Sequence, residues 1–72
     1  MGRRYDVVEG TVAQFDDRRG WGTVRAASGA EHFFHCTAIA DGSRSIEPGT
    51  AVRFVVVAGR LGRWEASAVE PR

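Results

Sequence analysis

The chain has 72 residues with one cysteine, 43% hydrophobic and 26% charged residues, and a formal net charge of +1. This length allows one small domain, the composition excludes a disordered chain, and a single cysteine excludes an internal disulfide framework. The sequence has no apolar run near the roughly 20 residues that span a bilayer, and no signal-peptide segment follows MGRRYD. We therefore expect a monomeric cytoplasmic protein that does not contact membranes.

Turn residues divide the chain into five short β-rich segments. Their β-branched and aromatic residues predict strands over residues 7–15, 21–26, 32–36, 50–58 and 63–69. In the first segment, counting by twos places Val8, Gly10, Val12 and Gln14 on one side. One helical turn is expected at Thr37–Ile39, at the start of the long connection over residues 37–49.

Five short strands in so small a chain predict an all-β fold, either a closed barrel or a sandwich. Closure would also remove the exposed strand edges that invite aggregation. We expect one domain over residues 1–72, with a core over about residues 7–69 and flexible ends at residues 1–6 and 71–72.

Little in the sequence indicates catalysis or metal binding. The carboxylates fall mainly in predicted turns, where solvation explains them, and no glycine-rich segment carries the Lys-Ser/Thr ending of a phosphate-binding loop. His32, His35 and Cys36 are zinc-ligand types, but alternation along a strand places the two histidines on opposite faces. We expect a protein that is not an enzyme and that has no metal, cofactor or small-molecule substrate.

The stretch RGWGTVRAASGAEHFFHC, residues 19–36, combines large aromatic residues with glycines and arginines. If Val24 and Phe34 face the core, alternation gives the two strands one shared outer face. That face carries Trp21, Thr23, Arg25, Phe33 and His35. Rings interleaved with arginines suit single-stranded nucleic acid, because bases stack on rings and guanidinium groups bind phosphates.

Two interpretations of these aromatics remain open at this level. In the first, Gly20 and Gly22 leave the ring of Trp21 open to a flat partner. In the second, the aromatics form a second small core under the connection over residues 37–49. The use of arginine and no lysine suits stacking contacts, but codon usage explains it at least as well and is the favoured explanation.

Four segments resemble motifs of the bacterial cold-shock domain family, in the same order. RGWGTV resembles K-G-F-G-F-I/V, and HFFHC followed by TAI resembles V-F-V-H-F-S-A-I. EGTVAQF is similar to E-G-T-V-K-W-F, and SIEPGTAVRF to L-x-E-G-Q-x-V-x-F. The resemblance covers about residues 7–69 and implies a five-stranded antiparallel barrel of the OB type. It also implies binding of single-stranded RNA or DNA, as an RNA chaperone or a regulator of transcription or translation.

The resemblance assigns roles to residues by position. Trp21, Phe33 and His35 match base-stacking residues, Arg19 matches a basic contact, and Phe15 matches an aromatic at the edge of the surface. Glu31 stands where the family has an Asp that hydrogen-bonds a base edge. With the neighbours of this face, the predicted nucleic-acid-binding set is Phe15, Arg18, Arg19, Trp21, Thr23, Arg25, Glu31, Phe33, His35, Arg60 and Trp64.

Several family rings are replaced in this chain. The family's Lys-Trp pair is Ala13-Gln14, and positions usually occupied by Phe are Thr23 and Cys36; Ser43 lies near the position of a loop aromatic. Trp64 adds a ring elsewhere. Since stacking contributes roughly 1–3 kcal/mol per base, we expect weak binding with a footprint of about three or four nucleotides. The alternative is a degenerate barrel that serves as a protein–protein interaction module, anchored by Trp21 and Trp64.

Overall fold

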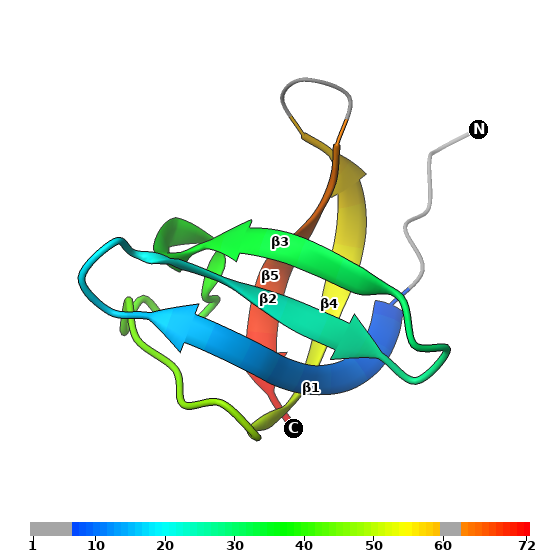
Figure 1. Ribbon diagram of the computed structural model, residues 1–72, viewed down its shortest axis with the longest axis horizontal. Helices are drawn as coiled ribbons and strands as arrows, with labels where there is room; N and C mark the ends of the chain where they lie inside the picture. Colours follow the sequence, from blue (N-terminus) through cyan, green and yellow to red (C-terminus); the bar gives the residue numbers. More distant parts are fainter. Residues whose placement is uncertain (1–6, 60–62) are drawn as a thin grey trace.

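Five strands and one 3-10 turn make up the part of the chain that the computed structural model describes, residues 7–59 and 63–72. They are β1 (Val7–Asp16), β2 (Trp21–Ala26), β3 (Glu31–His35), η1 (Cys36–Ala38), β4 (Ala51–Ala58) and β5 (Trp64–Pro71). The strands close into a barrel in the order β1-β2-β3-β5-β4, with a parallel β3–β5 contact and antiparallel pairing elsewhere (Figure 1). The predicted all-β barrel is confirmed.

One buried core fills the barrel. Its members are the inward residues of the five strands and two residues of the long connection: Val12, Val24, Ala26, Phe34, Ile39, Ile46, Val52, Phe54, Ala66 and Val69. Ile39 and Ile46 come from the connection over residues 37–49, which therefore supplies side chains to the main core. In the described residues these two positions do not form a separate core under the outer faces of β2 and β3.

A register shift in β1 changes which of its side chains face the core. Val12 pairs with Val24, but Gln14 pairs with Thr23, so Ala13 is the extra residue of a bulge. The prediction that Gln14 shares the side of Val12 is wrong, because the bulge reverses the alternation after Val12. Phe15 takes the inward position instead, and its ring stacks on that of Phe34 at a centroid distance of 5.6 Å.

The C-terminal residues are held in the barrel. Pro71 pairs with Val52, and the Arg72 backbone N–H donates a 2.9 Å hydrogen bond to the carbonyl of Ala51. The Arg72 guanidinium also lies 3.3 Å from the Glu9 carboxylate. Residues 71–72, which the sequence predicts to be flexible, thus pair with β4, while residues 1–6 lie outside the described part of the chain. In that part, no helix is long and apolar enough to cross a membrane.

Hydrogen bonds order the long connection. Asp41 accepts a 2.9 Å hydrogen bond from the Ser43 N–H. This bond, together with hydrogen bonding to the Ser43 hydroxyl, lowers the pKa of the Asp41 carboxyl. The Ser45 hydroxyl donates to Asp17 across 2.8 Å, which ties the connection to the β1–β2 turn. The connection is thereby fixed next to the arginines of that turn.

The glycines beside Trp21 have structural reasons. Gly20 has φ +76°, a left-handed conformation that favours glycine. Gly22 is buried and faces inward, and a Cβ there would collide with the carbonyl oxygen of Gln14 and lie 2.9 Å from the ring of Phe15. The interpretation that Gly22 opens the Trp21 ring is wrong, since Gly22 lies on the other side of β2. It allows β1 to approach β2.

Replacing Gly22 by alanine tests this close approach. Gly22→Ala should lower the free energy of unfolding by about 2 kcal/mol or more, because the new Cβ forces β1 away from β2. Gly29→Ala is the control: Gly29, unlike Gly22, has a positive φ, at +96°, but nothing lies within 4 Å of its Cβ position. It should cost only about 1 kcal/mol of backbone strain. Thermal unfolding followed by circular dichroism measures both, and equal losses would contradict the close approach at Gly22.

Candidate nucleic-acid interface

The outer faces of β2 and β3 form one continuous surface. Cross-strand pairs join Trp21 to His35, Thr23 to Phe33, and Arg25 to Glu31. The residues between them, such as Val24 and Phe34, are fully buried. The predicted alternation of these two strands is thereby confirmed.

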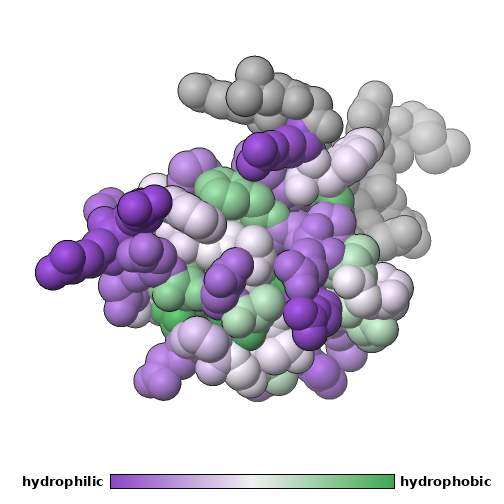
Figure 2. Space-filling view, viewed as in Figure 1, coloured by the Kyte–Doolittle hydropathy of each residue, from purple (hydrophilic) through white to green (hydrophobic). Residues whose placement is uncertain are grey.

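Three aromatic side chains gather on this surface, and we call Trp21, Phe33 and His35 the ring cluster. The centroids of Trp21 and Phe33 lie 5.4 Å apart at an interplanar angle of 31°, and those of Phe33 and His35 lie 4.9 Å apart, edge to face. Trp21 and Phe33 are half-buried and His35 is exposed. Figure 2 shows patches of neutral and apolar surface on this face, interrupted by hydrophilic groups, which also gather at the left beside the β1–β2 turn. The cluster is therefore accessible to a planar ligand.

The β1 side of this surface lacks rings. Gln14 is exposed and pairs with Thr23, whose hydroxyl oxygen is buried with no hydrogen-bond partner among residues 7–59 and 63–72. These are positions where the resembling family has Trp and Phe. The accessible rings are thus concentrated on β2 and β3.

The arginines of the β1–β2 turn are oriented by one carboxylate. Asp16 Oδ1 accepts hydrogen bonds from the backbone N–H groups of Arg18, at 3.0 Å, and Arg19, at 3.1 Å. The Arg19 guanidinium also lies 3.8 Å from Asp16 Oδ2, in an exposed pair that contributes at most about 1 kcal/mol. The turn therefore places both arginines beside Trp21, the cross-strand partner of Asp16.

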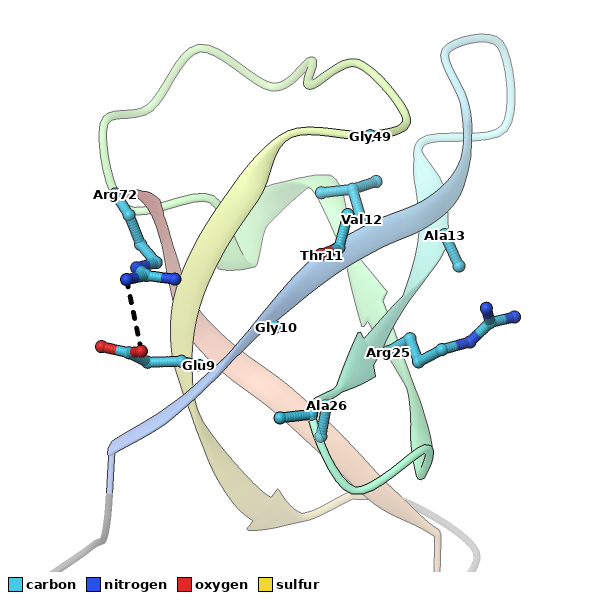
Figure 3. A pocket seen from close by; sticks show the side chains of 10 residues that line it. Glu9, Gly10, Thr11, Val12, Ala13, Arg25, Ala26, Gly49 and Arg72 are labelled. Atoms are coloured by element: carbon cyan, nitrogen blue, oxygen red, sulfur yellow. Dashed lines mark ion pairs between the residues drawn. The ribbon is translucent and has the colours of Figure 1, made fainter.

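Arg25 and Glu31 form an ion pair at the other end of the surface. Both the Nε and the Nη2 of Arg25 donate to Glu31 Oε2, at 3.1 and 2.7 Å. A guanidinium has five N–H donors, so three remain for a phosphate. The predicted hydrogen bond that Glu31 accepts from a base must compete with the bonds that it accepts from Arg25. Arg25 and Ala13 line the same hollow of about 620 Å³ beside β1 (Figure 3). Arg25 thus supplies a cation near Ala13, where the resembling family has lysine.

The remaining predicted residues are not members of the ring cluster. Phe15 is half-buried against the core and borders a hollow of about 420 Å³ that Trp21 also lines. Trp64, the first residue of β5, is 63% exposed, and among the described residues its ring pairs with none of Trp21, Phe33 and His35. The structure does not bring Trp64 into the cluster, and Arg60 lies outside the described residues.

One neighbour of the ring cluster was missed by sequence reasoning. Glu65 of β5 is the cross-strand partner of Phe33. The parallel pairing of β3 with β5 joins segments about 30 positions apart, and no local pattern in the sequence specifies that register. Only the closed barrel brings Glu65 next to Phe33 in the sheet.

The histidines and the cysteine do not form a metal site. His32 faces inward, with its ring 6.1 Å from that of Phe54, whereas His35 belongs to the outer face. The predicted separation of the two histidines is confirmed. Across the part of the chain that the structure describes, no three His, Cys, Asp or Glu side chains gather to hold a metal ion.

A closed five-stranded barrel with rings on the outer faces of two adjacent strands is the architecture of a small OB-type domain. The model of the family described as 'Cold-shock' DNA-binding domain matches residues 8–71. The chain belongs to the cold-shock domain family, whose members bind single-stranded nucleic acid and are not enzymes. This membership confirms the resemblance and the expectation that the protein is not an enzyme.

Relatives agree with this assignment over most of the chain. Cold shock protein CspA of Staphylococcus aureus is 38% identical over 63 residues, which cover 86% of this chain and 96% of the relative. Cold shock protein CspB of Geobacillus stearothermophilus is 36% identical over 62 residues, which cover 85% of this chain and 94% of the relative. The solved structure of Drosophila Unr CSD456 matches with a TM-score of 0.77 at 29% identity; the match covers 94% of this chain and 27% of that longer chain.

The unpartnered hydroxyl of Thr23 yields a stability prediction. Thr23→Val keeps the shape and removes the buried unsatisfied oxygen, so the free energy of unfolding should rise by up to about 1 kcal/mol. Thr23→Ser is the matched control, because it keeps the hydroxyl and loses the methyl group, and it should destabilise the protein. Chemical denaturation measures both variants. A loss of more than about 1 kcal/mol in Thr23→Val would show that the hydroxyl has a partner in solution.

Proposed function

We propose that the chain binds short segments of single-stranded RNA or DNA through the ring cluster, with weak affinity compared with its family. The observation that carries this proposal is the open arrangement of Trp21, Phe33 and His35, with neighbouring centroids 5.4 and 4.9 Å apart. We further propose that it acts as a cytoplasmic monomer, as an RNA chaperone or a regulator of transcription or translation. Membership in the cold-shock domain family supports this role.

Stacking is the main source of affinity in this proposal. Each base stacked on an aromatic ring contributes roughly 1–3 kcal/mol, and the cluster offers three rings. Gln14 and Thr23 offer none on the β1 side, and Cys36, which follows His35, adds no ring. The affinity therefore depends on fewer stacked bases than the family motif would provide, and the footprint is about three or four nucleotides.

Phosphate contacts add little because carboxylates offset the arginines around the cluster. The cations near it are Arg18, Arg19 and Arg25, and the neighbouring carboxylates are Asp16, Asp17, Glu31 and Glu65. Two of the three arginines already pair with a carboxylate, Arg19 with Asp16 and Arg25 with Glu31. Phosphates must therefore compete with these acids.

A second candidate function is supported by Trp64. A tryptophan that is 63% exposed and lies outside the ring cluster is a suitable anchor for a protein partner. In that case the barrel would bind another protein, with Trp64 in the contact, and would not bind oligonucleotides. Nucleic-acid binding depends on Trp21 and not on Trp64, whereas the protein contact depends on Trp64.

Alanine variants of the two tryptophans distinguish these functions. Trp21→Ala should weaken binding of a fluorescein-labelled heptathymidine or heptauridine at least fivefold, since one stacked base is lost. Trp64→Ala should change the affinity by less than about twofold, because its ring lies outside the cluster. Fluorescence anisotropy at low salt measures both, with circular dichroism to verify folding. If the wild-type protein binds neither oligonucleotide, the interaction-module function is favoured instead.

Salt dependence tests the balance of charges. A plot of log K against log salt concentration should have a slope no steeper than about −2, which corresponds to three phosphate contacts on a single strand. Replacing Arg18 by glutamine should make the slope shallower by about 0.7 if its guanidinium meets one phosphate. A slope steeper than about −4 would show that phosphate contacts outweigh stacking.

A further inference from the structure

The hollow of about 620 Å³ beside β1 is distinct from the ring cluster, since none of the three rings lines it. Figure 3 looks onto β1 across this hollow, with Glu9 and Arg72 on one side and Arg25 on the other. Gly49 and Ala26 lie at its other two ends in this view. Charged side chains therefore border the hollow on two opposite sides.

The floor of the hollow consists of small residues. Gly10, Thr11 and Ala13 of β1 line it, and Ala27 lines it at the end of β2. Ala13 is the extra residue of the bulge in β1. Position 10 accepts no side chain, because a Cβ there would collide with the carbonyl oxygen of Arg25. A floor without long side chains leaves room for a planar group to lie against β1.

The hollow continues the candidate interface. Arg25 pairs with Glu31 on one side and with Thr11 on the other, so it belongs both to the outer face of β2 and β3 and to the hollow. Arg25 stands two positions after Thr23, the partner of Phe33, and two residues of a strand advance roughly 6.6 Å. This advance is close to the spacing of adjacent phosphates in an extended single strand. A strand with one base on Phe33 therefore has its next nucleotide at the hollow.

Two guanidinium groups border the hollow, and each has donors left for a ligand. The Arg25 side chain extends away from β1 in Figure 3, and it gives two of its five donors to Glu31. The Arg72 guanidinium lies 3.3 Å from the Glu9 carboxylate, in an exposed ion pair of a kind that contributes little to stability. Arg25 can therefore bind a phosphate between the ring cluster and the hollow, while Glu9 opposes negative charge in the hollow and Arg72 offsets it.

The volume of the hollow suits one nucleotide. Sites for small ligands commonly have volumes of roughly 300–1,000 Å³, and about 620 Å³ lies within this range. No aromatic ring of the described residues lines the hollow. A base that lies there is held by its contact with small residues and by its phosphate, and not by stacking on a ring.

We propose that this hollow is a further nucleotide site, which takes the nucleotide next to the one stacked on Phe33. The base lies on the small residues of β1, and Arg25 binds the phosphate that joins the two nucleotides. This inference rests on the proposed function, since it needs a strand that the ring cluster holds. Three bases on the three rings and one nucleotide in the hollow then make a footprint of four nucleotides.

Fluorescein-labelled oligothymidines of three, four and five nucleotides test this site by fluorescence anisotropy at low salt. The wild-type protein should bind the tetramer about fivefold more tightly than the trimer, because the fourth nucleotide adds the contact in the hollow and the phosphate at Arg25. The step from tetramer to pentamer should be about twofold or less, since no further site is filled. Equal gains at both steps would indicate uniform attraction of charge and would overturn the inference.

A variant of the floor connects the gain from the fourth nucleotide to the hollow. Ala13→Leu places a longer side chain on the floor and should reduce that gain to about twofold or less. Ala58→Leu, at an exposed position of β4 outside the hollow, is the matched control and should keep the gain. Melting temperatures verify that both variants are folded.

The charged wall of the hollow provides variants of opposite effect. Glu9→Gln removes the carboxylate and should raise the gain from the fourth nucleotide about twofold. Arg72→Gln leaves Glu9 without its cation and should lower the gain about twofold. Glu70→Gln, in the exposed pair with Arg53, is the matched control and should leave the gain unchanged. Equal effects of these variants on trimer and tetramer would show that the charges act at long range and would contradict a site in the hollow.

The possible failures are distinguishable. If the wild-type protein binds trimer and tetramer with equal affinity, the inference fails and the proposed function stands. If the tetramer binds more tightly but Ala13→Leu keeps the gain, the fourth nucleotide lies elsewhere and the inference is again overturned. If the wild-type protein binds none of the oligothymidines, both the proposed function and the inference fail.

Discussion

The close contact of β1 with Gly22 is the constraint on which the rest of the interface depends. The Gln14 carbonyl and the Phe15 ring occupy the place of a side chain at position 22. The bulge at Ala13 turns Phe15 inward, where it stacks on Phe34. With β2 held against β1 in this register, the residues on either side of Gly22 point outward. The outer face thus results from how tightly the inner face is packed.

Stacking and charge have unequal weight at this interface. The ring cluster places three rings on two adjacent strands, while the surrounding arginines stand next to about as many carboxylates. A surface of this kind holds bases better than it holds phosphates.

Local patterns in the sequence predicted the strands and the ring cluster correctly. Alternation around Val24 and Phe34 was sufficient to place Trp21, Phe33 and His35 on one face. The same rule failed in β1, because a bulge adds one residue and reverses the faces after it. The C-terminal residues were expected to be flexible, and their pairing with β4 depends on a strand that is distant in the sequence.

The sequence by itself determined the family, the five strands and the aromatic residues of the outer face, since these follow from motifs and from a period of two residues. The tertiary structure alone decided that Gly22 is a packing requirement, that Trp64 lies outside the ring cluster and that Glu65 lies beside Phe33. These three outcomes depend on the register between strands and on the closure of the barrel. Register is fixed by packing between distant segments, and a local pattern does not contain that information.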